Sequence, residues 1–404
     1  MRTTSPRGRA GAVPRLARVV RLCAAMLLAG VTAAGCDAAA PPVPDGRAQA
    51  SAPTTAPSTV RPGVPERLTV VATGDVLLHE RLWVTARRDG HGRLDFGPLL
   101  AGVKPLVSSA DLAICHLETP LAPAGGPYRG YPLFAGPPQI ATALKQTGYD
   151  ACSTASNHSF DGGAAGVDRT LDTLDAAGLR HAGTARSAAE AGPAMVDVRG
   201  VKVALLSYTY GFNGLPYPHG ETWRANLLSE DRVHADARRA RAAGAAIVVV
   251  ICHWGDEYSP HPSAQQLRLA PRFVADSNID LVVGHHAHVV EPMEKIGGKW
   301  VAYGLGNLVA AHREPQSRMS EGLLARFTFT RGADGRWATS KAEYAPLLVT
   351  DRMPVRVLDV RRELTHHPGT GPASQERLRL ARGRTDDVVN SRGAARDGAT
   401  PITG

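Results

Sequence analysis

The stretch Ile279-Asp280-Leu281-Val282-Val283-Gly284-His285-His286-Ala287-His288 joins an apolar run to three imidazoles within four residues. The run from Leu281 to Val283 is short, aliphatic and followed by glycine, which is typical of a buried strand. Neutral imidazole is the commonest metal ligand in proteins, and α/β sheets place their sites at the carboxyl ends of strands. Packing alone explains such a cluster poorly, so the stretch predicts a metal site at a strand end.

Four further polar clusters upstream follow apolar, β-branched runs in the same way: Gly74-Asp75, Glu118, Asn157-His158 and His253. The pattern of apolar residues alternates between strand-like and helix-like periods, which indicates an α/β fold that becomes richer in strands toward its end. Strands are predicted at 68–72, 111–115, 151–154, 201–207, 246–252, 281–283, 300–303, 323–330 and 355–360. Helices are predicted at 139–147, 167–177, 230–243 and 264–276.

The ends of the chain differ in composition from its middle. Residues 1–35 combine six arginines with a short apolar run and small residues, which is typical of a secretory signal. Cys36 directly follows Ala34-Gly35 and resembles the lipidated cysteine of a bacterial lipobox, although Ala33 stands where leucine is usual. We therefore expect an extracytoplasmic protein held to the cell membrane by a lipid on Cys36. Simple secretion and an uncleaved anchor are the alternatives.

Residues 36–66 are rich in alanine, proline, serine and threonine and are predicted to form a disordered tether. The folded domain is predicted at 67–364, a length that can enclose a large apolar core. Residues 365–404 turn polar and rich in glycine and arginine, so we expect a disordered tail, with at most a helical turn or two at 375–381.

Charge and cysteine content exclude several classes of protein. The formal net charge is +9, but removing the six arginines before Cys36 leaves about +3. Aromatic residues make up only 5% of the chain and no basic patch is interleaved with them, so we expect no nucleic-acid partner. Cys115, Cys152 and Cys252 match neither a zinc ribbon nor a dense disulfide framework. We interpret them as small buried residues, with metal ligation as the alternative.

The first two clusters offer oxygen ligands. The carboxylate of Asp75 suits a divalent cation, although an isolated aspartate after a glycine is more often a helix cap or turn residue. His116 and Glu118 point to the same side of an extended segment, so Glu118 is a candidate oxygen ligand. A surface salt bridge is the alternative for Glu118.

The segment 156–163 places an amide, an imidazole and a carboxylate within five positions. Asn157 could coordinate a metal through its side-chain oxygen. His158 is a candidate catalytic residue that holds a developing oxyanion or delivers a proton, and Asp161 is a candidate to orient it. The alternative is a turn that caps the helix near Val167.

The later clusters supply nitrogen ligands and candidate substrate contacts. His253 ends the most apolar run outside the signal, which favours a metal ligand. Glu257 and Tyr258, in the next loop, are expected to contact substrate or to pack. On an extended backbone His286 and His288 face the same way and can chelate one ion or bridge two, whereas His285 faces the other side.

The turn Tyr303-Gly304-Leu305-Gly306-Asn307 lacks the surroundings of a dinucleotide fingerprint. Asn307 is predicted to bind substrate through a hydrogen bond, with a plain tight turn as the alternative.

Taken in order, an aspartate, an acid on a second strand, Asn-His, a histidine and Gly-His-His-x-His resemble the ligand set of calcineurin-like metallophosphoesterases. Within that superfamily the chain is most similar to bacterial capsule-synthesis proteins of the CapA type, associated with poly-γ-glutamate. The segments that carry the resemblance are 74–76, 117–121, 156–161, 253–258, 284–288 and 305–307. The chain departs from the pattern at three places: Val76 and Leu77 replace an Asp-x-His continuation, Glu118 replaces a bridging aspartate, and His116 replaces an asparagine.

This resemblance implies a four-layer α/β/β/α sandwich of metallophosphoesterase type. It also implies one or two divalent ions (Mn, Zn or Fe), with His158 as acid or electrostatic stabiliser. The implied metal ligands are Asp75, Glu118, Asn157, His253, His286 and His288. The function that follows is a surface-tethered, metal-dependent hydrolase-like protein in capsule or envelope polymer synthesis, acting on a phosphoester or a γ-glutamyl amide. The rival is a non-catalytic assembly or export factor that binds an anionic polymer or a membrane-bound partner.

Overall fold

The computed structural model describes residues 65–311, 314, 317–367 and 370–403. The signal, Cys36 and nearly all of the tether lie outside the described residues, so the predictions about them stay untested. Within the described ranges, no helix is both long and apolar enough to cross a membrane.

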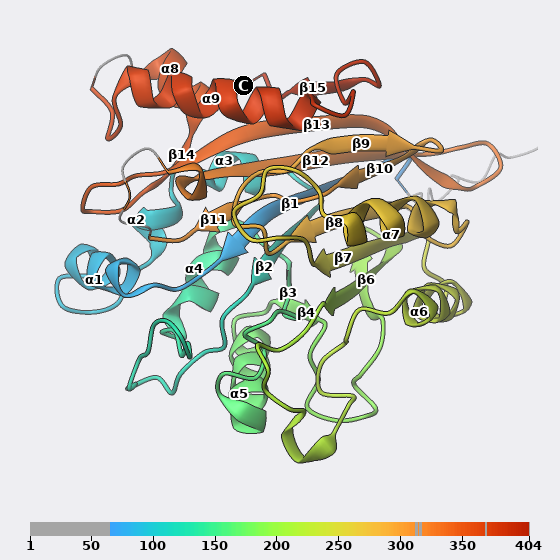
Figure 1. Ribbon diagram of the computed structural model, residues 1–404, viewed down its shortest axis with the longest axis horizontal. Coiled ribbons are helices and arrows are strands. Elements are labelled where there is room, and N and C mark those ends of the chain that lie inside the picture. Colours follow the sequence, from blue (N-terminus) through green and yellow to red (C-terminus); the bar gives the residue numbers. More distant parts are fainter. Residues whose placement is uncertain (1–64, 312–313, 315–316, 368–369, 404) are drawn as a thin grey trace, which may run out of the picture. The chain divides into compact units, whose positions relative to one another are not determined.

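The strands of the described chain form two sheets (Figure 1). One sheet follows the order β14 (Val357–Asp359), β13 (Trp337–Val349), β12 (Glu321–Arg331), β1 (Arg67–Val76), β2 (Leu112–Leu117), β3 (Ala151–Ser153) and β4 (Arg180–Ala182). Two short strands join it, because β11 (Asn307–Val309) pairs with β1 and β15 (Ala399–Pro401) pairs with β13. The other sheet has the order β5 (Ala194–Val198), β6 (Val201–Thr209), β7 (Ile247–His253), β8 (Leu281–His285), β10 (Lys299–Ala302) and β9 (Met293–Ile296).

Strand β7 shows why its sequence is continuously apolar. Its odd-numbered residues Ile247, Val249 and Ile251 pack in the core between the two sheets. Its even-numbered residues pack in a second core under helices α6 (Glu230–Ala242) and α7 (Ala264–Ala275). Successive side chains of a strand point to opposite faces, so a strand covered on both sides needs apolar residues at every position.

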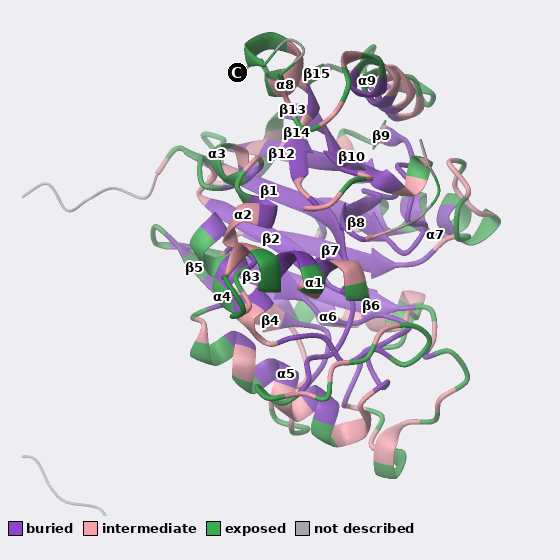
Figure 2. Cartoon of the chain, turned by 90° about the vertical axis from the view of Figure 1, so that its left-hand side faces the viewer, coloured by how far each residue is buried: buried purple, intermediate pink, exposed green. Residues whose placement is uncertain are grey.

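The same argument applies to the nine-stranded sheet, whose outer face is covered by helices from the first half of the chain (Figure 2). These helices are α1 (Glu80–Asp89), α2 (Gly97–Leu100), α3 (Lys104–Val107), α4 (Gln139–Thr147) and α5 (Gly163–Ala176). The layers therefore run helices, sheet, sheet, helices, which confirms the predicted α/β/β/α sandwich. Strand β13 and the helices α1 and α8 (Val360–His366) were absent from the sequence prediction, which allowed only a helical turn or two at the start of α9 (Gln375–Asn390).

The predicted disordered tail is wrong for residues 375–390 and 399–401, which form α9 and β15. Leu378 and Ala381 of α9 are buried against the edge of the sandwich. Arg377 and Arg384 of α9 both contact the buried carboxylate of Glu321 in β12. Two of the arginines that indicated disorder therefore form ion pairs with a buried glutamate that is distant in sequence.

The cysteine interpretation is also corrected. Cys115 and Cys152 are buried, as expected, but they lie opposite each other on β2 and β3 and form a disulfide. Their pairing depends on which strands are neighbours, and the sequence spacing does not contain that information. Cys252 is a buried free thiol.

Candidate metal centre

Three histidines meet between the sheets because each lies at a position of its strand whose side chain points toward the other sheet. His253 follows Val249 and Ile251 on the face of β7 that points into the inter-sheet core. By the same period of two, His116 in β2 and His285 in β8 lie on the inter-sheet faces of their strands. All three are at the carboxyl ends of parallel strands, as the α/β pattern predicts.

Asp75 joins this cluster because β1 is irregular at that point. The register of β1 shifts between Ala72 and Asp75 against β2, and again after Asp75 against β11. A bulge of this kind re-aims a side chain. The carboxylate of Asp75 is fully buried, and its Oδ1 lies 2.7 Å from His285 Nδ1. Its Oδ2 accepts a hydrogen bond from the backbone N–H of His286 at 3.2 Å and lies 3.3 Å from His288 Nδ1.

Asp75 is the negative centre of the cluster. Burial alone would raise the pKa of its carboxyl, but hydrogen bonds from His285 and His288 outweigh burial and hold that pKa well below its ordinary value. Asp75 is therefore a carboxylate ready to bind a cation.

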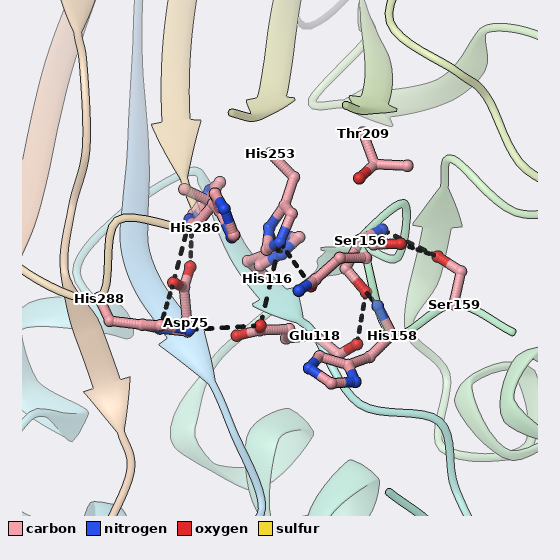
Figure 3. Close-up of polar contacts among 12 residues, drawn as sticks. Asp75, His116, Glu118, Ser156, His158, Ser159, Thr209, His253, His286 and His288 are labelled. Carbon is pink, nitrogen blue, oxygen red and sulfur yellow. Dashed lines mark hydrogen bonds and ion pairs between the residues drawn. The ribbon is translucent and has the colours of Figure 1, made fainter. Parts of the chain in front are cut away.

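Glu118 lies directly after β2 and is the group least satisfied by the protein. Its Oε1 is 3.6 Å from His288 Nε2 and 3.9 Å from His253 Nε2 (Figure 3). Neither buried carboxylate oxygen has a hydrogen-bond partner among the described residues. Burial raises the pKa of Glu118 to about 7, although the charge of His288 opposes the rise. Such a group is costly unless a cation compensates it.

Asn157 completes this side of the cluster. Its Oδ1 lies 2.9 Å from His253 Nε2, so an amide oxygen, an imidazole nitrogen and a carboxylate oxygen converge. The structure thus brings together three side chains that the sequence proposed as ligands, and their role as ligands stays a prediction. Mixed nitrogen and oxygen donors suit a divalent transition metal.

The segment after β8 corrects the assumption of an extended backbone. His286 and His288 have φ values of 94° and 56°, both in the left-handed region that non-glycine residues rarely occupy. Both rings still reach the site, with centroids 6.1 Å apart. His285 also points inward, against the prediction that it faces away. His285 is two positions after Val283 and four after Leu281, so the alternation of the strand already indicated that the three side chains share one face.

The two rings differ in charge. Burial lowers the pKa of His286 to about 4, and its Nδ1 is buried without a hydrogen-bond partner among the described residues. Burial also opposes the charge on His288, but Glu118 and Asp75 prevail and raise its pKa to about 10. His286 is therefore a neutral imidazole with an uncommitted nitrogen, which is the form that binds metals.

His158 lies beside the cluster with its partner in place. Its Nδ1 is 2.7 Å from Asp161 Oδ2, as the sequence predicted for an oriented histidine. Its position is fixed by Ser156, which the sequence analysis did not single out. The Ser156 hydroxyl donates to the backbone carbonyl of Glu118 at 2.6 Å and accepts from the backbone N–H of His158 at 3.1 Å.

The three predicted substrate contacts fall in different places. Glu257 is exposed and its carboxylate is near the rings of His286 and His288. Tyr258 is 54% exposed, with its ring 6.2 Å from that of His288. Asn307 is fully buried, its Oδ1 is 3.0 Å from His288 Nδ1 and its Nδ2 donates to the His288 carbonyl. Asn307 therefore holds His288, and its full burial gives no support to the prediction that it contacts substrate.

The residues fit a divalent cation. Three groups bring their ligand atoms within 4.8 Å of one another: Asp75 with Glu118 and His288, Asp75 with His116 and His285, and Glu257 with His286 and His288. Unpartnered buried atoms on Glu118 and His286 face this region and would be satisfied by a metal ion.

The fold and site define a class: an α/β/β/α sandwich with a buried histidine–carboxylate cluster at the ends of its strands. The chain belongs to the family described as bacterial capsule synthesis protein PGA_cap, whose family model matches residues 69–312. This match confirms the resemblance to capsule-synthesis proteins.

Individual relatives agree with the family. A Bacillus subtilis protein named PGA biosynthesis protein CapA is 30% identical over 225 residues, which cover 53% of this chain and 54% of that protein. The capsule biosynthesis protein CapA of Bacillus anthracis is 27% identical over 254 residues, or 60% of each chain. This chain therefore spans little more than half the length of these two relatives. A probable polyglutamine synthesis accessory protein of Mycobacterium tuberculosis is 27% identical over 320 residues, covering 74% of this chain and 80% of that protein.

Solved structures show more distant similarity. The calcineurin-like phosphoesterase YfkN from Bacillus subtilis aligns with 82% of this chain and 99% of its own, at 14% identity and a TM-score of 0.44. A phosphatase from Mycoplasma pneumoniae aligns with 70% of this chain and 94% of its own, at 12% identity and a TM-score of 0.43.

Proposed function

We propose that this protein is a metal-dependent hydrolase that acts in the synthesis of a capsule or envelope polymer of the poly-γ-glutamate type. The observation that carries the proposal is Glu118, whose two buried oxygens have no hydrogen-bond partner among the described residues while His253 and His288 face them as ion-pair partners at 3.9 and 3.6 Å. Without a metal ion, the charge of His288 faces Glu118 at 3.6 Å, but both carboxylate oxygens stay buried without a hydrogen bond, at a cost of several kcal/mol.

The proposed ligands of one or two divalent ions (Mn, Zn or Fe) are Asp75, Glu118, Asn157, His253, His286 and His288. A bound divalent ion supplies a Lewis acid and lowers the pKa of a coordinated water. The reacting bond is a phosphoester or an amide of a γ-linked glutamyl polymer. Both reactions develop negative charge that a cationic site stabilises.

Other residues of the chain supply proton transfer, substrate contact and positioning. Asp161 occupies Nδ1 of His158, so Nε2 is the ring nitrogen left to hold a proton near the leaving group. Glu257 and Tyr258, both exposed and beside the His286 and His288 rings, contact the substrate. Asn307 and Ser156 position His288 and His158.

A surface location is part of the proposal. A cysteine after a cationic and apolar segment supports lipidation at Cys36. The Cys115–Cys152 disulfide supports an extracytoplasmic location, because disulfides form and persist mainly in oxidising compartments. Membrane-bound capsule-synthesis proteins are then its proposed partners. Fractionation of cells that express the wild type or Cys36→Ala tests the location. Wild type in the membrane fraction and the variant released from it is the expected result, and a cytosolic wild type contradicts the proposal.

The catalytic test compares three forms of the full chain: wild type, His158→Ala and the His286→Ala/His288→Ala double variant. Metal content by elemental analysis and hydrolysis of bis(p-nitrophenyl) phosphate and of a γ-glutamyl p-nitroanilide are measured on each. We expect one or two equivalents in wild type and His158→Ala, a loss of metal in the double variant, and turnover in wild type only.

Two results contradict the proposal in different ways. A wild type that takes up none of Mn, Zn and Fe refutes the metal centre. A metal-loaded wild type that hydrolyses neither substrate refutes catalysis and favours the assembly or export factor, whereas equal turnover in wild type and His158→Ala refutes the role of His158.

A further inference from the structure

His116 is a fully buried imidazole between the two sheets, and both of its ring nitrogens are engaged. Its Nε2 is 3.0 Å from Nδ1 of His253, across the gap between the sheets. Its Nδ1 is 2.8 Å from the hydroxyl of Ser153, which in turn donates to the backbone carbonyl of Cys115 at 3.4 Å. The four groups form one chain of hydrogen bonds that leads away from the metal centre.

The other nitrogen of His253 faces the candidate ligands. Its Nε2 lies 2.9 Å from Asn157 Oδ1 and 3.9 Å from Glu118 Oε1. A neutral imidazole coordinates a metal through the nitrogen that carries no proton, and the partner of the other nitrogen sets which one that is. For Nε2 of His253 to coordinate, its Nδ1 must carry the proton and have an acceptor.

His116 Nε2 lies where that acceptor must be. Without a metal the same contacts also fit the reverse direction, in which His253 Nε2–H donates to Asn157 Oδ1, so a metal on Nε2 is what selects the direction. With a metal on Nε2, His253 Nδ1–H donates to His116 Nε2, so the proton of His116 is on Nδ1 and donates to Ser153. The Ser153 hydroxyl can accept this bond and still donate to the carbonyl of Cys115, because a hydroxyl has one proton and two lone pairs. Every donor in the chain then has an acceptor.

Direct coordination by His116 is disfavoured by ring geometry. Asp75, His116 and His285 bring ligand atoms within 4.8 Å of one another. The rings of His116 and His285 are, however, stacked with centroids 4.2 Å apart and planes inclined by 19°. The lone pair of an imidazole nitrogen lies in the ring plane, so two nearly parallel rings cannot both aim at one ion about 2 Å away.

We propose that His116 is a positioning residue that fixes the metal-binding tautomer of His253, with Ser153 as the terminal acceptor. The inference rests on the metal centre of the proposed function and assigns His116 a role that its neighbours in sequence do not reveal. Loss of such a partner of a ligating histidine weakens metal binding 10–100-fold as an order of magnitude.

The test uses the full chain with Zn²⁺ as the probe and four variants. His116→Phe keeps a flat ring against His285 but removes the acceptor. His116→Gln restores an acceptor oxygen at about the same reach. Ser153→Ala removes only the far end of the chain, and His234→Phe is the matched control, because His234 pairs with Asp276 outside this cluster.

Two quantities are measured. The Zn²⁺ dissociation constant comes from competition with a chelating indicator. The tautomer of His253 comes from long-range ¹H–¹⁵N correlations of the zinc-loaded protein labelled on histidine, with the signal assigned by its loss in His253→Gln. We expect an Nδ1–H tautomer in wild type. The affinity should fall 10–100-fold in His116→Phe, recover mostly in His116→Gln, fall less in Ser153→Ala and stay unchanged in His234→Phe.

The outcomes separate the two claims. Wild type that binds neither Zn²⁺ nor, in the same competition assay, Mn²⁺ or Fe²⁺ refutes the proposed function and this inference together. Tight binding by wild type with equal affinity in His116→Phe, or an Nε2–H tautomer of His253 in the zinc-loaded protein, refutes the inference alone. If His116→Phe fails to fold, the tautomer of the wild type and the effect of Ser153→Ala decide the question.

Discussion

Replacing Glu291 by glutamine should make the protein more stable at neutral pH, and the gain should depend on pH. Glu291 is fully buried beside α7, and its Oε2 accepts a hydrogen bond from Gln266 Nε2 at 2.7 Å. Its Oε1 has no hydrogen-bond partner among the described residues. Burial raises the pKa of Glu291 from 4.5 to about 8, and the bond from Gln266 only partly offsets the rise.

The magnitude follows from linkage between protonation and folding. An acid whose pKa is higher in the folded protein is ionised first in the unfolded chain, so rising pH favours unfolding between the two pKa values. Each pH unit in that window is worth about 1.4 kcal/mol. The free energy of unfolding of the wild type should therefore fall by roughly 3 kcal/mol, relative to Glu291→Gln, from pH 4.5 to 7, and by roughly 4 kcal/mol by pH 8.

The assay is urea unfolding of both proteins at several pH values from about 4 to 8.5, with a chelator present so that bound metal does not contribute to stability. Tryptophan fluorescence is a suitable signal because the Trp254 indole donates to the carbonyl of Tyr303, which also accepts from Gln266. Taking the difference between the two proteins cancels every other titrating group. A difference that stays constant with pH would refute the reasoning, since it would mean that Glu291 is ionised or neutral in both states alike.

Three other changes have predictable effects. The Cys115→Ala/Cys152→Ala variant removes a disulfide that spans 37 residues and should lower the free energy of unfolding by about 4 kcal/mol, measured by urea unfolding without reductant; equal stability of wild type and variant would contradict this. Arg377→Met leaves Glu321 with a single arginine partner and should cost about 3 kcal/mol, seen as faster amide hydrogen exchange in α9; unchanged exchange would show that α9 does not depend on this ion pair. Gly284→Ala places a Cβ 1.7 Å from the backbone carbonyl oxygen of Tyr303. We expect the free energy of unfolding to fall by about 3 kcal/mol or more, measured by thermal unfolding. A melting temperature equal to that of the wild type would be inconsistent with the close approach.

The sequence predicted much of the fold because its strands are buried on both faces. The runs at 201–207, 246–252 and 281–283 became β6, β7 and β8, with ends shifted by two residues or fewer. Helix 139–147 was predicted at its observed bounds. The helix at 375–390 was predicted as a turn or two at most, because a helix with few apolar residues is stabilised here by an ion pair with distant Glu321.

For the site, the sequence by itself determined which chemical groups are present and that each follows a strand, since an apolar run that ends in a histidine or acid is a local pattern. Only the tertiary structure decided how they act. The bulge that turns Asp75 inward, the left-handed backbone at His286 and His288, the burial of Asn307 and the bond between His116 and His253 all depend on contacts between distant segments. Side-chain direction at a strand end is set by register and backbone conformation, and both are fixed only when the two sheets pack.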